Sequence, residues 1–323
     1  MIAYDKRGVV FALTEGAELL LHDGDSEGPL WRKTLDGSIV GLGIDSEQVV
    51  AVTEAGTVIG FSARTGDVRG TQTLGARVRQ ASIDVGVDRV VAITDTQVVQ
   101  LLAGTHKVLA EHAAHALAVS PEGTVLVATE TEVVLLDGAR RTRALDGVKA
   151  VAYHPQGFWV LGLQSKLLRW DGTGEPSHIT NLPPGSKLEH VACSERALAV
   201  SWDRHMVVAL EWPSRETLGS LQYLERVVEG IDFGPWPWLG VGLDLGDGNK
   251  FHLEEARLHR SDTHPGRQHH SWLVSVGGSA KAEPARPSAP APVPAPAPAT
   301  GGSPLPLVLL AIAVALVIFF VVR

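Results

Sequence analysis

Short apolar runs that end in a polar residue recur along the first 280 residues of the chain. Seven such runs are present, and their last residues are Asp5, Asp45, Asp84, Ser120, His154, Ser194 and Asp232. Consecutive ends lie 34 to 40 residues apart. A period of this size is typical of architectures that repeat one supersecondary unit, which predicts seven copies of one unit.

Each copy contains further runs that predict β-strands. In the second copy, runs rich in Val follow at residues 48–52 and 57–61, and a more polar run follows at 68–73. Runs of this length between Gly, Asp, Thr and Pro turns are typical of strands. We therefore predict four-stranded sheets whose fourth strand meets water.

Seven four-stranded units resemble a seven-bladed β-propeller over residues 1 to about 278. Residues 151–172 (VAYHPQGFWVLGLQSKLLRWDG) resemble a WD-repeat blade with Trp170 and Asp171 at the end of its third strand, whereas FSARTGDVRG at 61–70 resembles quinoprotein-type repeats. The resemblance implies an all-β propeller. We expect the ring to close by pairing residues 1–4 with the late strand 271–276, because an open ring would expose a sheet edge.

The C-terminal part predicts a tether and a membrane anchor. Residues 279–304 are almost all Ala, Pro, Ser and Gly, which predicts a disordered, extended linker. Residues 305–322 form an apolar run of about 27 Å as a helix, enough for one transmembrane helix. Its apolar side chains include Leu305, Leu310, Leu316, Phe319, Phe320 and Val322. This arrangement resembles tail-anchored proteins.

Charge and composition restrict the partners and the location. The net charge is -8, which argues against nucleic acid as a partner. The single Cys193 predicts no internal disulfide. No export signal is visible at the N-terminus, so we expect the folded domain in the cytoplasm of a single-pass membrane protein, with the bacterial inner membrane as the expected site.

Acidic residues occupy the turns between the second and third predicted strands. They are Glu15, Glu54, Asp95, Glu130, Asp203, and Asp244 with Asp247. If these turns share one face of the propeller, they form a negative ring that could attract a basic protein partner. The alternative is that Thr, Asp and Glu are ordinary turn residues.

The seventh copy departs from the others and holds two further candidate sites. Trp236 and Trp238 lie between prolines and are candidates for a partner contact, with packing between blades as the alternative. His259, His264, His269 and His270 lie in an insertion and could bind Zn²⁺, although a polar loop explains them equally well.

Catalytic motifs are not visible in the sequence. No nucleotide-binding loop, nucleophile elbow or zinc-protease motif is present, so we expect no cofactor. We therefore predict a membrane-tethered cytoplasmic scaffold that binds proteins through its rim loops. The alternatives are a propeller enzyme, quinoprotein-like or metal-dependent and lactonase-like, and a small-molecule sensor.

Overall fold

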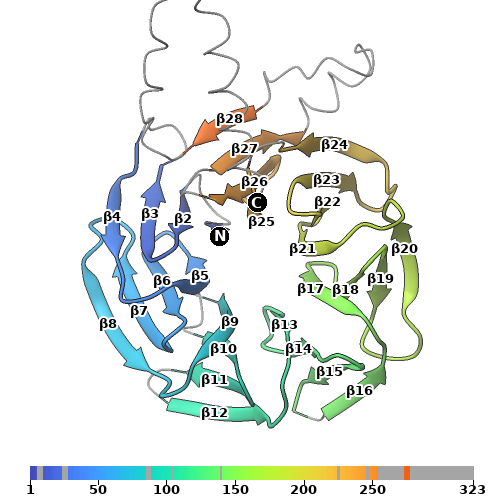
Figure 1. Ribbon diagram of the computed structural model, residues 1–323, viewed down its shortest axis with the longest axis horizontal. Helices are drawn as coiled ribbons and strands as arrows, with labels where there is room; N and C mark the ends of the chain where they lie inside the picture. Colours follow the sequence, from blue (N-terminus) through green and yellow to red (C-terminus); the bar gives the residue numbers. More distant parts are fainter. Residues whose placement is uncertain are drawn as a thin grey trace, which may run out of the picture. The chain divides into compact units, whose positions relative to one another are not determined.

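Antiparallel four-stranded sheets arranged around a central axis make up the folded part of the chain (Figure 1). The computed structural model describes residues 1–5, 10–23, 28–84, 89–102, 105–138, 140–223, 226–244, 248–253 and 273–276. Each of the seven sheets consists of four strands that are consecutive in the sequence. The predicted seven-bladed β-propeller is therefore confirmed, and we number the blades in chain order.

The strands of each blade run in sequence from the axis to the outer edge. Blade 1 contains β1 (Ile2–Tyr4), β2 (Phe11–Glu15), β3 (Glu18–His22) and β4 (Trp31–Thr34), and blade 2 contains β5 (Ile39–Ile44), β6 (Gln48–Thr53), β7 (Thr57–Ser62) and β8 (Val68–Thr73). Blade 3 contains β9 (Val78–Asp84), β10 (Arg89–Thr94), β11 (Val98–Leu102) and β12 (Thr105–Ala110), and blade 4 contains β13 (Ala116–Val119), β14 (Val125–Ala128), β15 (Glu132–Leu136) and β16 (Arg140–Ala144). Blade 5 contains β17 (Val148–His154), β18 (Phe158–Leu163), β19 (Lys166–Trp170) and β20 (Ser177–Asn181). Blade 6 contains β21 (Leu188–Cys193), β22 (Ala197–Trp202), β23 (Met206–Glu211) and β24 (Thr217–Gln222). Blade 7 contains β25 (Val228–Phe233), β26 (Trp238–Leu243), β27 (Gly248–His252) and β28 (Leu273–Val276).

Burial falls from the second strand to the fourth strand of a blade, as the apolar and polar pattern predicts. All six residues of β18 in blade 5 are buried, whereas five of the six residues of β8 in blade 2 are exposed. The apolar marker runs of the sequence form the first strands, which line the axis.

The core lies between neighbouring blades. Along β10, Val90 and Ala92 pack toward blade 2, while Val91 and Ile93 pack toward blade 4. Because side chains alternate between the two faces of a strand, every central strand contributes to two inter-blade cores. This packing holds each blade at a set position relative to the next blade.

Ring closure differs from the prediction that residues 1–4 pair with the late strand. β1 is the first strand of blade 1, β28 is the last strand of blade 7, and the two belong to different sheets. Blades 1 and 7 instead meet through packing of β1 against β25 and β26. The backbone N–H of Tyr4 also donates a hydrogen bond of 2.9 Å to a carboxylate oxygen of Asp232 in β25.

The predicted linker at 279–304 and the predicted span at 305–322 lie outside the described residues. Within the part of the chain that the structure describes, no helix has the length and apolar character needed to cross a membrane.

Candidate protein-interaction surface

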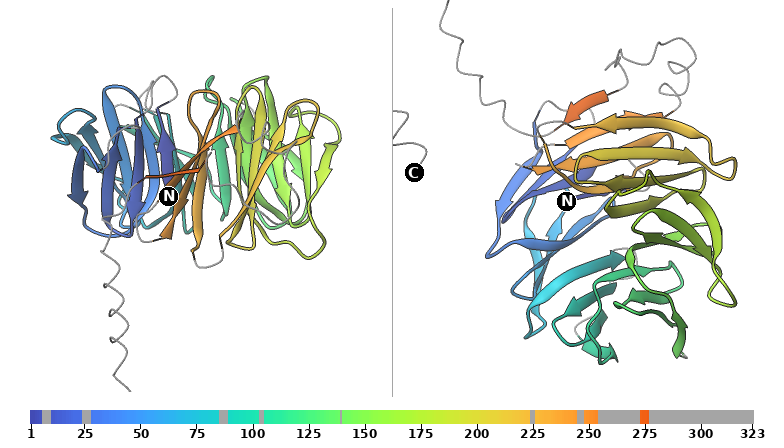
Figure 2. Two further views of the ribbon diagram at one scale, coloured as in Figure 1. Left: turned by 90° about the horizontal axis from the view of Figure 1, so that it is seen from above. Right: turned by 45° about the vertical axis from the view of Figure 1, so that its right-hand side comes forward.

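Six predicted acidic residues lie in turns on one face of the ring. Every blade has the same antiparallel strand order, so the turns between second and third strands lie on the same face (Figure 2). We call this the hairpin face, and it also carries the beginnings of the first strands. The turns of this face place Glu15, Glu54, Asp95, Glu130, Asp203 and Asp244 on it. Asp247 lies outside the described residues.

The threonine that precedes the acid stabilises several of these turns. The hydroxyl of Thr94 accepts hydrogen bonds from the backbone N–H groups of Thr96 and Gln97, at 3.4 and 3.0 Å. The hydroxyl of Thr129 likewise accepts the backbone N–H of Glu132 at 3.1 Å. A short hydroxyl side chain that bonds nearby backbone groups favours a turn. The threonines are therefore structural, and Asp95 and Glu130, which follow them, are exposed.

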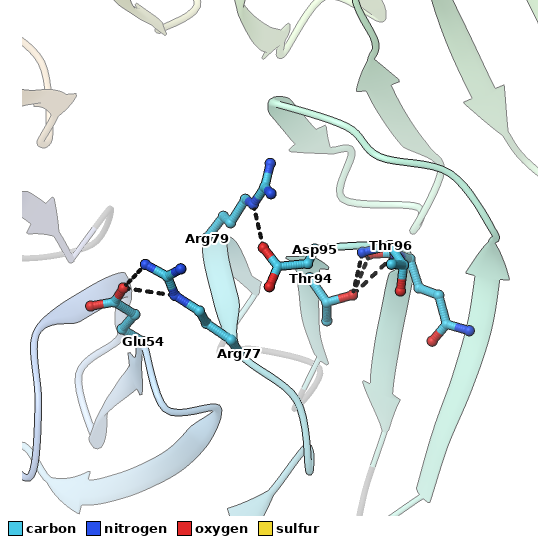
Figure 3. A network of polar contacts seen from close by, with 7 residues as sticks. Glu54, Arg77, Arg79, Thr94, Asp95 and Thr96 are labelled. Atoms are coloured by element: carbon cyan, nitrogen blue, oxygen red, sulfur yellow. Dashed lines mark hydrogen bonds and ion pairs between the residues drawn. The ribbon is translucent and has the colours of Figure 1, made fainter.

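Arginines that flank the start of β9 neutralise two of these acids (Figure 3). The guanidinium of Arg77 donates to the Glu54 carboxylate, with an Nε to Oε1 distance of 2.9 Å. Arg79 donates from Nε to Oδ1 of Asp95 at 2.7 Å. The hydrogen bond to Glu54 and the negative charge of Glu54 raise the pKa of Arg77 above its ordinary value.

A third pair lies in blade 7. Arg226 donates from Nε to Oδ1 of Asp244 at 2.7 Å, and the backbone N–H of Val227 donates to the same oxygen at 3.1 Å. Burial opposes ionisation of Asp244, but these hydrogen bonds and the charge of Arg226 are stronger and lower the pKa of Asp244. Glu15 and Glu130, by contrast, form no ion pair with any described residue.

The turn between β22 and β23 has a strained backbone. Asp203 and Arg204 have φ angles of 52° and 62°, a region that side chains other than glycine rarely adopt. The Asp203 carboxylate accepts the backbone N–H of Lys187 at 2.8 Å, which attaches the turn to the start of β21. Strain of this kind persists only where neighbouring groups hold it, and it is concentrated at functional sites.

A cavity of about 570 Å³ opens at the axis on the hairpin face. First strands or hairpin turns of blades 1, 2, 5, 6 and 7 line it, and its charged residues include Lys149, Glu189, Arg204 and Glu229. His190 also lines this cavity, and burial lowers the pKa of its imidazole to about 4. The cavity therefore combines charges of both signs with a histidine that is neutral at pH 7.

Trp236 and Trp238 lie on the opposite face. Their turn joins the first and second strands of blade 7, and such turns lie at the other end of the blades. Arg196 of blade 6 lies over the Trp236 ring, 5.5 Å from its centroid. Trp238 contacts the ring of His252 edge-on at 4.8 Å and the ammonium of Lys250 at 5.2 Å. Both Trp rings are partly buried in contacts with these residues, and partner binding through them stays a prediction.

The four histidines predicted as metal ligands, His259, His264, His269 and His270, lie outside the described residues. Over the ranges that the structure does describe, no cluster of three or more His, Cys, Asp or Glu side chains could hold a metal ion.

Six basic residues of the hairpin face were not identified from the sequence. They are Arg77, Arg79, Lys149, Lys187, Arg204 and Arg226. Except for Arg204, each lies within two residues of the beginning of a first strand. A basic residue at the start of an apolar marker run was therefore a usable signal. Its acidic partner could not be identified in the same way, because Glu54 is 23 residues from Arg77 and Asp95 is 16 residues from Arg79.

Comparisons with known proteins address the fold. Models of known protein families do not match the chain, and no curated protein matches it either. Many solved chains have a similar structure. One is the β-propeller domain of Cps50 (Swd1) from Myceliophteria thermophila, with 14% sequence identity and a TM-score of 0.66; the match covers 77% of this chain and 94% of that chain. At this identity the similarity establishes the fold alone, which is that of a β-propeller.

Proposed function

We propose that the chain is a membrane-tethered cytoplasmic scaffold that binds a protein partner on its hairpin face. The observation that carries this proposal is the axial cavity of about 570 Å³, which is lined by charged residues of the first strands and bordered by the strained turn at Asp203 and Arg204. Side chains held in place by such a frame need little reordering when a partner binds, which favours affinity.

The charges of this face define the chemistry of the partner. Near the axis, Lys149 and Arg204 line the cavity beside Glu189 and Glu229, so this region offers charges of both signs to the partner. Farther out, Glu15 and Glu130 have no ion pair among the described residues and favour basic groups. Glu54 and Asp95 are already paired with arginines, so they attract a basic partner less than the sequence suggested. Complementary charges of both signs set orientation and specificity more than affinity.

The proposed anchor keeps the partner near a membrane. Residues 279–304, if extended, could span up to about 80 Å at ~3.1 Å per residue. The apolar run 305–322 supports a single span. The end of the propeller domain would then stay within that distance of the bilayer.

Partner capture with charge-reversed full-length chains tests the proposal. The natural chain is used to capture a partner from membranes of its source cells. We expect the double variant Lys149→Glu with Arg204→Glu to capture at least about tenfold less of that partner. Glu15→Lys with Glu130→Lys should weaken the same partner.

Matched variants on the opposite face control for the change in net charge. Glu47 and Glu195 lie in exposed turns between first and second strands. Glu47→Lys with Glu195→Lys changes the net charge by the same amount as Glu15→Lys with Glu130→Lys. This control variant should leave capture unchanged. Equal capture by all four chains would overturn the assignment of the hairpin face.

A further inference from the structure

The third strand of blade 2 is much less buried than other third strands. Only Phe61 is fully buried in β7, whereas three residues of β15 in blade 4 and four residues of β3 in blade 1 are buried. The cause lies on the surface of blade 2 that faces blade 3. Gly60 of β7 is paired with Gly70 of β8, so two adjacent strands lack a side chain at this point.

Among the described residues, no neighbour fills the space beside these glycines. Of the described atoms, a Cβ atom built on Gly60 would meet the backbone oxygen of Gly70 alone, at 4.0 Å, and one built on Gly70 would meet none within 4 Å. In blade 4 the third-strand residue that pairs with Leu126 is Leu135, which fills the equivalent space. Gly70 is exposed and Gly60 is partly buried, so this space opens to solvent at the outer edge of blade 2.

A cleft of about 330 Å³ occupies this place between blades 2 and 3. Its apolar lining comes from Val50 and Val58 on one side and from Ile83, Val90 and Leu101 on the other. The residues on each side come from adjacent strands, which lie about 4.8 Å apart. The cleft therefore runs about 10 Å across the blades, and its volume suits one extended alkyl chain or a single ring.

Three charged residues line the cleft: Arg69, Asp84 and Arg89. Asp84 and Arg89 are paired between β9 and β10, and the Arg89 guanidinium lies beside Gly123 of blade 4. Arg69 lines it from β8, the outermost strand of blade 2, at an irregularity where Gly60 pairs with Gly70 and Phe61 pairs with Val68. Bulges of this kind re-aim side chains. No ion pair or side-chain hydrogen bond joins Arg69 to another described residue. Asp84, at the end of β9, lines the cleft from the strand nearest the axis.

We propose that this cleft binds a small amphipathic monocarboxylate with a medium-length alkyl chain. The carboxylate pairs with Arg69 at the outer end, since the guanidinium is a strong donor to carboxylates. The alkyl chain lies between the valines of blade 2 and the apolar residues of blade 3.

Calorimetric titration of the full-length chain with octanoate tests this assignment. We expect octanoate to bind, and octylammonium, which has the opposite charge, to bind at least about tenfold more weakly. Arg69→Gln should weaken octanoate about tenfold, because it removes the charged partner, and should leave 1-octanol unaffected. Arg64→Gln, at an exposed arginine of the same blade outside the cleft, should bind octanoate like the natural chain.

Gly60→Val provides a second, independent arm. A Cβ atom at position 60 meets no described atom closer than 4.0 Å, and valine suits a strand, so this variant should fold, unfold at a higher temperature and bind no octanoate. Absence of octanoate binding by the natural chain would overturn the proposal. Equal binding of octanoate and octylammonium, or unchanged octanoate binding by both Arg69→Gln and Gly60→Val, would also overturn it.

Discussion

The contact between blades 1 and 7 makes a sharp prediction about one glycine. Gly240 in β26 faces the side chains of β1, and a Cβ atom added there would lie 2.1 Å from Cε2 of Tyr4 and 2.7 Å from Cδ1 of Ile2. Tyr4 and Ile2 are only 3% and 6% exposed. A methyl group at position 240 therefore cannot be accommodated without moving the first strand away from blade 7.

The expected cost of Gly240→Ala is at the upper end of the range for overpacked cores, about 3 kcal/mol. Two buried side chains of one strand must move, and the same strand carries the Tyr4 hydrogen bond to Asp232. For a folded unit of this size, we expect the midpoint of thermal unfolding to fall by roughly 5–10 °C. Tryptophan fluorescence during heating measures this shift.

Two further chains separate a clash at the blade contact from a general intolerance of alanine in strands. Gly70→Ala places its Cβ in open space and should change stability by less than about 0.5 kcal/mol. Tyr4→Leu removes the atom nearest to position 240, so Gly240→Ala should cost at least about 1 kcal/mol less in that background. An unfolding midpoint for Gly240→Ala equal to that of the natural chain, or an equal cost in both backgrounds, would refute this account of ring closure.

Three other predictions follow from the rim, a buried histidine and the C-terminal run. Glu54→Gln should change the free energy of unfolding by less than about 1 kcal/mol, measured in urea, because its ion pair is exposed to solvent. Burial, and then the charge of Arg169, lower the pKa of His154 from 6.5 to about 4 in the folded chain. The unfolded chain therefore binds this proton first, stability is lost as the pH falls from 6.5 toward 4, and urea titrations of His154→Phe should show a smaller loss over that window. Leu310→Arg with Leu316→Arg should move the chain from the membrane to the soluble fraction on centrifugation, because each arginine costs about 2.5–3.5 kcal/mol in a span; full retention in the membrane would contradict the anchor.

The repeat predicted the architecture well because each blade is local in the sequence. Strands that pair within a blade are neighbours along the chain, so the apolar runs and the turns between them contain most of the information. The fourth strand predicted at 68–73 corresponds to β8 with the same bounds. The positions of Glu54 and Asp95 in hairpin turns followed from the same periodicity.

Contacts between blades were harder to predict because they depend on register. Arg77 and Arg79 neutralise acids from turns that the chain reaches earlier or later, and the sequence alone does not align these turns in space. The cleft beside Gly60 and Gly70 likewise exists only because both glycines pair in one register. A shift of one residue would move each glycine to the other face of its strand and close the cleft.

Ring closure illustrates the same difference between local pairing and contacts between distant strands. The prediction used hydrogen bonding between the chain ends to remove a sheet edge, but every blade here is complete without the other end of the chain. What remains to be joined is a pair of apolar faces, and the glycines of β25 and β26 make one of them flat enough for Ile2 and Tyr4. The fit depends on the absence of side chains at Gly240, at Gly242 and at Gly234, which follows β25. Closure by packing in place of shared hydrogen bonds makes these glycines as important to the ring as the strand that packs on them.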